Sequence, residues 1–223
     1  MDNKSAYDSG VYDQNITNTL PYYAEYHKQI TDLVAKMGFD GILWLDTGCG
    51  TGTLADIALA SPSLKDTSFT LCDPSENMLA EAKAKLKRPE IRYLNCSSQE
   101  LGFDREFEVV TAVQCHHYLM PGEREEATRR CYRALKEGGV YITFENIRMS
   151  TEESDRIAML RWTDFIRKNF KDEERVRKHT ARRGTEVHPI TIEEHLDLLR
   201  KCGFKSVNLL WVSYLQAGFW AIK

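Results

Sequence analysis

Short apolar runs alternate with helical stretches from about residue 40 to the end of the chain. Runs of this kind are typical of buried parallel strands, because helices cover both faces of a parallel sheet. The alternation therefore predicts an α/β fold. The predicted strands are Ile42–Leu45, Ser68–Cys72, Ile91–Leu94, Glu108–Val113 and Val140–Phe144, and the predicted helices are Thr53–Leu59, Ser75–Leu86 and Glu123–Leu135. We expect the last of these helices to end at Lys136-Glu137-Gly138-Gly139, where glycine allows a left-handed turn.

The C-terminal segment departs from this alternation. Thr191-Ile192-Glu193-Glu194 is a capping box, which predicts a helix running to Lys201 and ending at Gly203. Two strand-like runs follow, Ser206–Val212 and Gly218–Ile222, and their connection is too short for a parallel pair. The sequence thus predicts a Rossmann-like, seven-stranded sheet that is mostly parallel and ends in an antiparallel hairpin.

A glycine-rich segment lies between the first predicted strand and the helix that follows it. It reads Leu45-Asp46-Thr47-Gly48-Cys49-Gly50-Thr51-Gly52, so glycine recurs at every second position. Glycine lets the backbone approach a ligand closely and adopt positive φ. Asp46 offers an acceptor suited to an ammonium group. The dinucleotide-binding fingerprint would need its third glycine at Thr53 instead, which disfavours a nicotinamide-dependent oxidoreductase.

A second polar position follows the next predicted strand. Asp73 lies about 20 residues beyond the glycine-rich segment, a spacing that suits a carboxylate accepting hydrogen bonds from ribose hydroxyls. Pro74 comes directly after it, Met78 follows in the next predicted helix, and we include both in the predicted site. Asp73 could also cap the following helix, and the two roles are compatible.

Two segments outside the predicted sheet are expected to form a helical cap. Residues 1–38 carry several tyrosines and an amphipathic helix, and residues 149–188 form a charged helical insertion. The length of 223 residues fits one domain with such a cap. We divide the chain into an N-terminal cap (1–38), a core with the glycine-rich segment (39–148), a lid insertion (149–188) and the end of the sheet (189–223).

Charge and composition narrow the possible partners. The net charge of -3 and the pI near 6.1 give no global reason to expect nucleic acid or an anionic membrane. The insertion interleaves basic residues with Trp162, Phe165 and Phe170, a pattern that can bind RNA. Its Asp172-Glu173-Glu174 run favours the solvated face of a lid helix. We therefore expect a small-molecule acceptor and no nucleic acid or membrane as partner. Whether the chain also forms a homodimer stays open.

Several features bear on compartment and metal binding. The six cysteines are scattered without a CxxC pair, which predicts neither a disulfide framework nor a zinc site. The N-terminal residues are polar, and no apolar run is long enough to span a bilayer. We expect a cytoplasmic protein with no metal ligands.

The motifs together resemble those of class I S-adenosylmethionine-dependent methyltransferases. The resemblance rests on Asp46-x-Gly48-x-Gly50-x-Gly52, on Asp73 and on Lys136-Glu137-Gly138-Gly139. It implies that the glycine loop holds the methionine part of S-adenosylmethionine and that Asp73 holds the ribose. It also implies that Ser97, Ser98 and Gln99 contact the adenine, and that Val113 and Gln114 lie beside the sulfonium.

The flanks resemble a narrower family, the carboxy-S-adenosylmethionine synthases that serve tRNA wobble-uridine modification. The resemblance is carried by Tyr12-Asp13-x-x-Ile16-x-x-x-Leu20-Pro21-Tyr22-Tyr23 and by the tail from Thr191 to Lys223. It implies that Tyr23 covers the cofactor and that Arg182 or Arg183 contacts the extra carboxylate. That family usually has serine where Gly50 stands, so this loop is more similar to that of an ordinary methyl-donor enzyme.

Three residues are candidates for acid–base chemistry. His116 and His117 follow the fourth predicted strand, and Glu145 ends the fifth. Histidine titrates near neutrality and can act as a general base. Adjacent residues at a strand end point in opposite directions, so we expect at most one of the two histidines to serve.

The sequence favours a metal-independent methyltransferase that uses S-adenosylmethionine and a small-molecule acceptor. Direct displacement at a sulfonium methyl group requires alignment and a dry site rather than a covalent intermediate. The alternatives are an enzyme that modifies the cofactor, as carboxy-S-adenosylmethionine synthases do, a tRNA-modification enzyme, and a cofactor-binding regulatory subunit. The acceptor pocket of this fold is built from variable caps, so the motifs do not name the acceptor.

Overall fold

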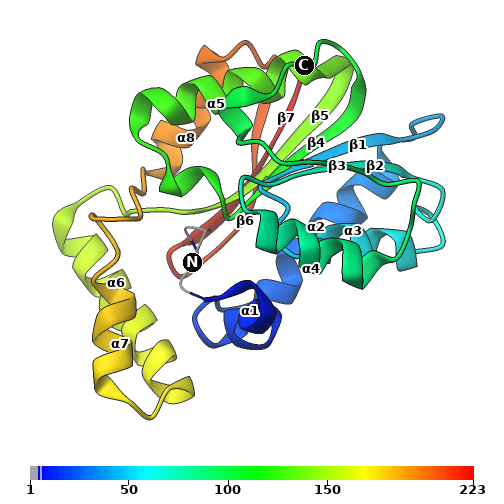
Figure 1. Cartoon of the computed structure of the whole chain (residues 1–223). Coiled ribbons are helices and arrows are strands. Elements are labelled where there is room, and N and C mark those ends of the chain that lie inside the picture. Colours follow the sequence, from blue (N-terminus) through cyan, green and yellow to red (C-terminus); the bar gives the residue numbers. More distant parts are fainter. Residues whose placement is uncertain (1–4, 6) are drawn as a thin grey trace.

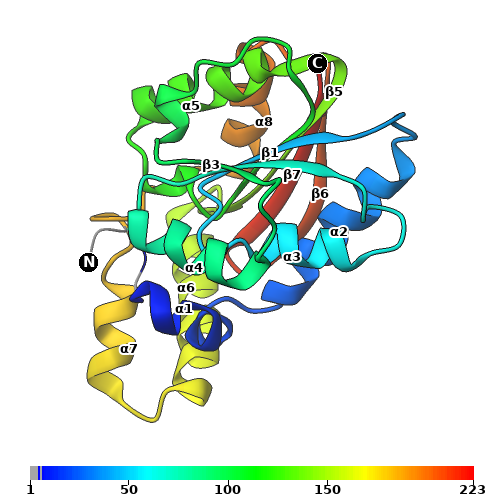
Figure 2. The same cartoon turned by 45° about the vertical axis from the view of Figure 1, so that its right-hand side comes forward.

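The computed structural model describes residue 5 and residues 7–223, and it has a central sheet with helices on both faces (Figures 1 and 2). The remaining residues of the predicted N-terminal cap, 1–4 and 6, lie outside the described residues. The strands are β1 (Leu43–Thr47), β2 (Ser68–Cys72), β3 (Arg92–Leu94), β4 (Phe107–Val113), β5 (Leu135–Asn146), β6 (Ser206–Ser213) and β7 (Gln216–Ile222). The α-helices are α1 (Ser9–Asn15), α2 (Tyr23–Lys36), α3 (Thr53–Ala60), α4 (Glu76–Leu86), α5 (Pro121–Ala134), α6 (Glu152–Asn169), α7 (Glu173–Thr180) and α8 (Ile192–Lys201). The short 3₁₀ helices are η1 (Ile16–Asn18), η2 (Ser98–Glu100) and η3 (His116–Tyr118).

The sheet has the strand order β3-β2-β1-β4-β5-β7-β6. The first five strands are parallel, and β7 is antiparallel to both β5 and β6. The predicted fold class is therefore confirmed, including the antiparallel C-terminal hairpin. Because β1 and β4 are adjacent and parallel, the loops that follow them open at the same edge of the sheet.

Two hydrophobic layers hold the sheet between its helices. One layer packs α2, α3 and α4 on the sheet, with Tyr26 stacked on Phe144 at a ring-centroid distance of 4.8 Å. The other packs α5 and α8, through buried residues such as Cys131 and Leu199. α2 buries Ile30 and Val34, as its amphipathic pattern predicts, and so belongs to the first layer.

The end of α5 differs from the prediction. The helix ends at Ala134 rather than at the two glycines, because Leu135 is extended and pairs with Phe107 of β4. Gly138 and Gly139 lie within β5 instead, where the positive φ of Gly138 (+76°) allows the chain to turn and continue in the sheet. The prediction failed because Leu135 is fully buried and pairs with a strand of the sheet, which stabilises an extended conformation there over a last turn of helix.

The two cap segments contact each other. The indole nitrogen of Trp162 in α6 donates to the backbone oxygen of Thr19 (2.8 Å), and Tyr7 stacks on His179 of α7. Asp13 of α1 accepts a hydrogen bond from Thr51 of the glycine-rich segment (2.6 Å). The N-terminal segment thus joins the lid insertion to the edge of the sheet where the glycine-rich segment lies (Figure 2).

Candidate functional site

A cavity of about 1000 Å³, open mouth included, lies at the carboxyl ends of β1, β2, β3 and β4. We call it the loop cavity, since the glycine-rich segment forms part of its wall. The predicted residues that line it are Gly48, Gly50, Asp73, Pro74, Met78, Ser97, Ser98, Gln99, Val113 and Gln114. The fold brings together side chains from four consecutive strand ends, as the motif spacing indicated.

The three glycines of the segment have different surroundings. Gly50 has φ +53°, and a Cβ added to it would meet no protein atom within 4 Å, so this position opens to the loop cavity. A Cβ on Gly48 would lie 2.5 Å from the Cβ of Cys115. Gly52 packs α3 against α4, where its added Cβ would lie 3.2 Å from that of Ala82. Gly52 therefore serves helix packing and does not line the loop cavity.

Asp73 connects the glycine-rich segment to the end of β2. Its carboxylate accepts a hydrogen bond from the backbone N–H of Gly50 (2.8 Å) and another from that of Ser75 (2.9 Å). The side chain that caps α4 is Ser75, which accepts from the N–H of Met78. Asp73 fixes the loop, and its side chain lines the loop cavity.

Asp46 and Tyr23 lie behind the cavity wall rather than in it. Asp46 is buried and accepts a hydrogen bond from the hydroxyl of Thr111 (2.7 Å). Burial raises the pKa of Asp46 to about 7, and the nearby charge of Asp73 adds to the rise. Tyr23 hydrogen-bonds the side chain of Tyr12, which does line the loop cavity. Tyr23 thus contacts a residue that lines the loop cavity.

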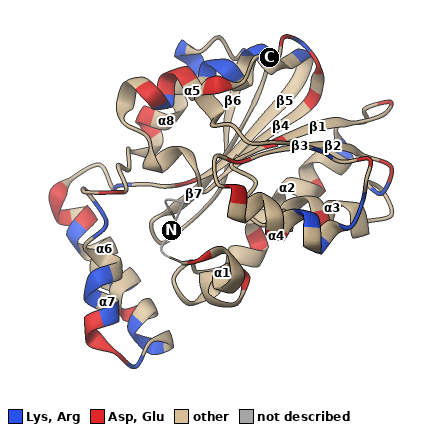
Figure 3. Cartoon of the chain, in the orientation of Figure 1, with Lys and Arg blue, Asp and Glu red and all other residues tan. Residues whose placement is uncertain are grey.

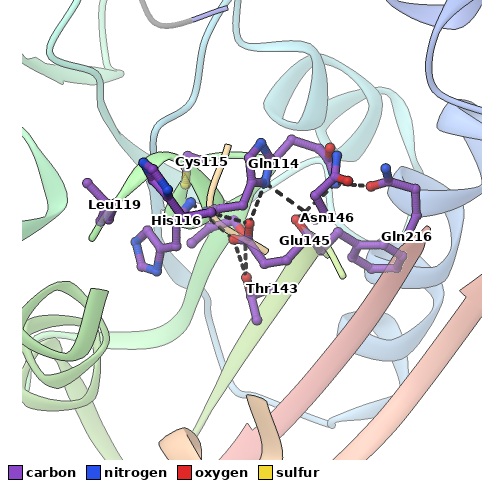
Figure 4. Close-up of polar contacts among 12 residues, drawn as sticks. Gln114, Cys115, His116, Leu119, Thr143, Glu145, Asn146 and Gln216 are labelled. Atoms are coloured by element: carbon purple, nitrogen blue, oxygen red, sulfur yellow. Dashed lines mark hydrogen bonds and ion pairs between the residues drawn. The ribbon is translucent and has the colours of Figure 1, made fainter. Parts of the chain in front are cut away.

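A second cavity lies between the sheet and the helical cap, and we call it the cap cavity. It shares Ser5, Tyr12, Gln114 and Tyr118 with the loop cavity, so the two are adjacent. Its other lining residues are Tyr7, Ile16, Thr19, Leu20, His117, Asn146, Trp162, His179, Arg182, Arg183 and Val187. Gln114, at the junction, has φ +56°, and its amide donates to Gln216 (2.8 Å), as Figure 4 shows.

The two histidines lie in η3 and not at an extended strand end, so the alternation argument used for them was wrong. They nonetheless face different cavities: His116 lines the loop cavity and His117 the cap cavity. Neither ring nitrogen of His116 is open to a ligand, because Nδ1 contacts the hydroxyl of Tyr141 (3.3 Å) and Nε2 is fully buried. Burial lowers the pKa of His116 to about 4.

His117 forms a buried pair with Glu145. Its Nδ1 lies 2.7 Å from a carboxylate oxygen of Glu145, and both side chains are at most 3% exposed. Glu145 also accepts the backbone N–H groups of His116 (3.1 Å) and His117 (2.9 Å) and the hydroxyl of Thr143 (2.9 Å). Figure 4 shows Glu145 and Thr143 within this network. Burial alone would raise the pKa of Glu145, but the hydrogen bond and charge of His117 outweigh it and lower the pKa to about 2.

Arg182 and Arg183 both line the cap cavity, and neither lines the loop cavity. The guanidinium of Arg182 lies over the ring of Tyr118, and its Nε donates to Glu186 (2.8 Å). Arg183 donates to Asp155 (2.8 Å) and to the backbone oxygen of Ile147 (3.0 Å). The arginines predicted from the flanking resemblance are therefore on the cap side.

Sequence reasoning did not identify most of the cap cavity. Tyr118, Asn146, Trp162 and His179 come from segments far apart in the chain and carry no motif of their own. Tyr12 belongs to the same N-terminal motif as Tyr23, but the family resemblance implies Tyr23 as the residue over the cofactor. For Tyr118, the one indication in the sequence is its position directly after the candidate residue His117.

Acidic and basic residues alternate along α6 and α7 (Figure 3). Exposed ion pairs join Arg167 to Asp164 and to Glu173, and Lys178 to Glu174. Across residue 5 and residues 7–223, no group of three or more His, Cys, Asp or Glu side chains is arranged to hold a metal ion. Within the same residues, no helix combines the length and apolar character needed to cross a membrane.

Comparison with known proteins agrees with this geometry. Residues 45–139 match a family model described as a methyltransferase domain. A carboxy-S-adenosyl-L-methionine synthase from Nitratiruptor sp. is 28% identical over 96% of this chain and 90% of its own. A synthase of the same name from Nautilia profundicola is 23% identical over 96% of this chain and 92% of its own.

Solved structures share the fold at lower sequence identity. The CurJ carbon methyltransferase superposes with a TM-score of 0.70 and 16% identity, over 96% of this chain and 58% of its own. The [4+2]-cyclase SpnF superposes with a TM-score of 0.57 and 21% identity, over 82% of this chain and 59% of its own. One architecture thus serves different reactions. Residues 45–139 thus match a methyltransferase domain, the sheet has the fold of solved methyltransferases, and the chain as a whole is similar to proteins named carboxy-S-adenosyl-L-methionine synthase.

Proposed function

We propose that this chain transfers the methyl group of S-adenosylmethionine to a small molecule bound in the cap cavity. The observation that supports this most is the pair of adjacent cavities. The loop cavity is lined by the residues of the methyltransferase motifs, and the cap cavity meets it at Tyr12, Gln114 and Tyr118. A methyl donor in the first and an acceptor in the second would meet at this junction.

The residues present fit the cofactor. Gly50 opens a space that any side chain would fill, and the carboxylate of Asp73 is positioned to accept bonds from ribose hydroxyls. Ser97, Ser98 and Gln99 would surround the adenine, and Val113 and Gln114 would flank the sulfonium. When bound, S-adenosylmethionine supplies an electrophilic methyl carbon. The aromatic and helical cap would exclude water from it.

Asp73→Ala tests the assignment of the ribose site. We expect the variant to bind S-adenosylmethionine more weakly by roughly 1.5–3 kcal/mol, the range for a hydrogen bond to a charged group. Isothermal titration calorimetry measures the change, and Asp66→Ala serves as an exposed control. Equal affinity of Asp73→Ala and the wild type would remove Asp73 from the site.

Methyl transfer should not depend on a divalent metal. Direct displacement does not need a Lewis acid, and alignment can supply much of the rate. We expect activity to survive dialysis against EDTA. Loss of activity on chelation, restored by Mg²⁺, would contradict this and point to Asp and Glu residues near the strand ends.

A second candidate is an enzyme that modifies the cofactor itself, and the curated relatives named carboxy-S-adenosyl-L-methionine synthase favour it. In that case Arg182 or Arg183 would contact an added carboxylate, and replacement by lysine would reduce retention of the modified cofactor. Gly50 and the location of both arginines on the cap side favour ordinary methyl transfer. We therefore propose that Arg182 and Arg183 contact the acceptor in the cap cavity. A cytoplasmic location, a homodimer and the absence of a nucleic-acid partner remain predictions.

A further inference from the structure

We infer that His117 and Glu145 form a general-base pair, so that the acceptor is a weak acid whose nucleophilic atom carries a proton. The inference rests on the proposed function and defines its substrate class. Such acceptors include hydroxyl groups of the phenol or enol type, thiols and activated C–H groups. Amines with a free lone pair and carboxylates need no base and fall outside the class.

The geometry assigns one nitrogen of His117 to Glu145 and the other to the cap cavity. A carboxylate 2.7 Å from Nδ1 accepts a hydrogen bond, so Nδ1 carries the proton of the neutral ring. The backbone N–H of Asn146 also faces Nδ1, at 3.4 Å. The shorter, charge-assisted bond decides the tautomer. Nε2 then has the free lone pair, on a ring that lines the cap cavity.

Glu145 is held as an anion by its surroundings. Three donors besides His117 Nδ1 point at its two oxygens, and they come from the backbone of η3 and from Thr143. An anion fixed behind the ring stabilises the imidazolium that forms when Nε2 takes a proton. Arg124, itself buried, holds η3 in place through hydrogen bonds to the backbone oxygens of His116 and Leu119 (3.1 Å each).

The step balances without a further reactant. Nε2 of His117 takes the proton of the acceptor, and the electron pair left on the acceptor atom forms a bond to the methyl carbon. The bond between that carbon and sulfur breaks, and its electron pair stays on sulfur, which becomes a neutral thioether. His117 then releases its proton to water. Glu145 stays a carboxylate throughout.

The first test reads the tautomer of His117 directly. In protein labelled with ¹⁵N-histidine, long-range ¹H–¹⁵N correlation distinguishes the two neutral forms, and His117→Gln identifies the signal. We expect protonated Nδ1 and unprotonated Nε2 at pH 8, and a loss of this preference in Glu145→Gln. A proton on Nε2 in the wild type would overturn the proposal.

The second test, at pH 8, uses catechol, 4-nitrocatechol and aniline, whose nitrogen is unprotonated at this pH, as acceptor probes. We expect catechol to be methylated, and His117→Gln and Glu145→Gln to slow its methylation by about 10²–10⁴-fold. The loss should be much smaller with 4-nitrocatechol, which is already ionised. A structural role would lower both rates equally. Methylation of aniline alone, or of no probe, would overturn the acceptor class.

Calorimetry with S-adenosylmethionine separates this inference from the proposed function. Both variants should bind it with nearly wild-type affinity, as should the control His27→Gln, which removes a buried histidine from α2. If the wild type fails to bind S-adenosylmethionine, the proposed function is wrong. If it binds and both variants keep the wild-type catechol rate, only the general-base pair is wrong.

Discussion

Replacing Gly50 with valine is expected to abolish binding of S-adenosylmethionine. The added Cβ would enter open space of the loop cavity, and the valine branches would fill the path of the ligand. A β-branched residue at φ +53° also strains the loop that Asp73 holds. Calorimetry should detect no binding in Gly50→Val at concentrations that saturate the wild type.

Gly38→Val is a matched control for this prediction. Gly38 also has positive φ (+71°) and no neighbour within 4 Å of an added Cβ, but it lies in the turn after α2 and does not line the loop cavity. It should lose stability from strain and keep its affinity. If Gly50→Val binds as well as Gly38→Val, the loop cavity is not the cofactor site.

The protein should lose stability steeply as the pH falls from about 6.5 towards 4. Burial lowers the pKa of four histidines to about 4 from the usual value of 6.5, and these are His27, His116, His179 and His195. Between these pH values the unfolded chain binds more protons than the folded chain. The free energy of unfolding therefore decreases as the pH decreases. Asp46 opposes the trend, because its folded pKa of about 7 lies above the unfolded value of 3.8.

Four histidines against one aspartate leave a net loss of up to roughly 6 kcal/mol between pH 6.5 and 5, since one pKa unit is worth about 1.4 kcal/mol. Urea unfolding at pH 7.5, 6 and 5 measures it, and His195→Gln should flatten the dependence because an amide does not titrate. Equal urea midpoints at pH 7.5 and 5 would show that these histidines are not held neutral in the folded protein.

The sheet and the loop cavity were predictable because their signals are local. A buried parallel strand is a short apolar run, and the ligand contacts of this fold come directly after such runs, as at Gly50, Asp73 and Ser97. The end of α5 was not predictable in this way. Local propensity places it at Gly138, whereas the pairing of Leu135 with Phe107 is a long-range contact that moves it to Ala134.

The cap cavity shows the same limit. It joins Tyr7, His117, Trp162 and Arg183, whose proximity depends on how the N-terminal segment packs on α6 and α7. The sequence also did not distinguish His116 from His117, since both follow β4. Only the turn of η3 directs the ring of His116 to Tyr141 and the ring of His117 to Glu145.

Native mass spectrometry of the chain as purified from cells, with the ligand that copurifies, tests the central claim most directly. The account predicts a retained ligand with the mass of S-adenosylmethionine or of its demethylated product, and no retention by Gly50→Val. A ligand heavier than S-adenosylmethionine by one carboxylate group would contradict ordinary methyl transfer and favour a synthase of the modified cofactor. Absence of any adenosyl ligand in the wild type would contradict the assignment of the loop cavity itself.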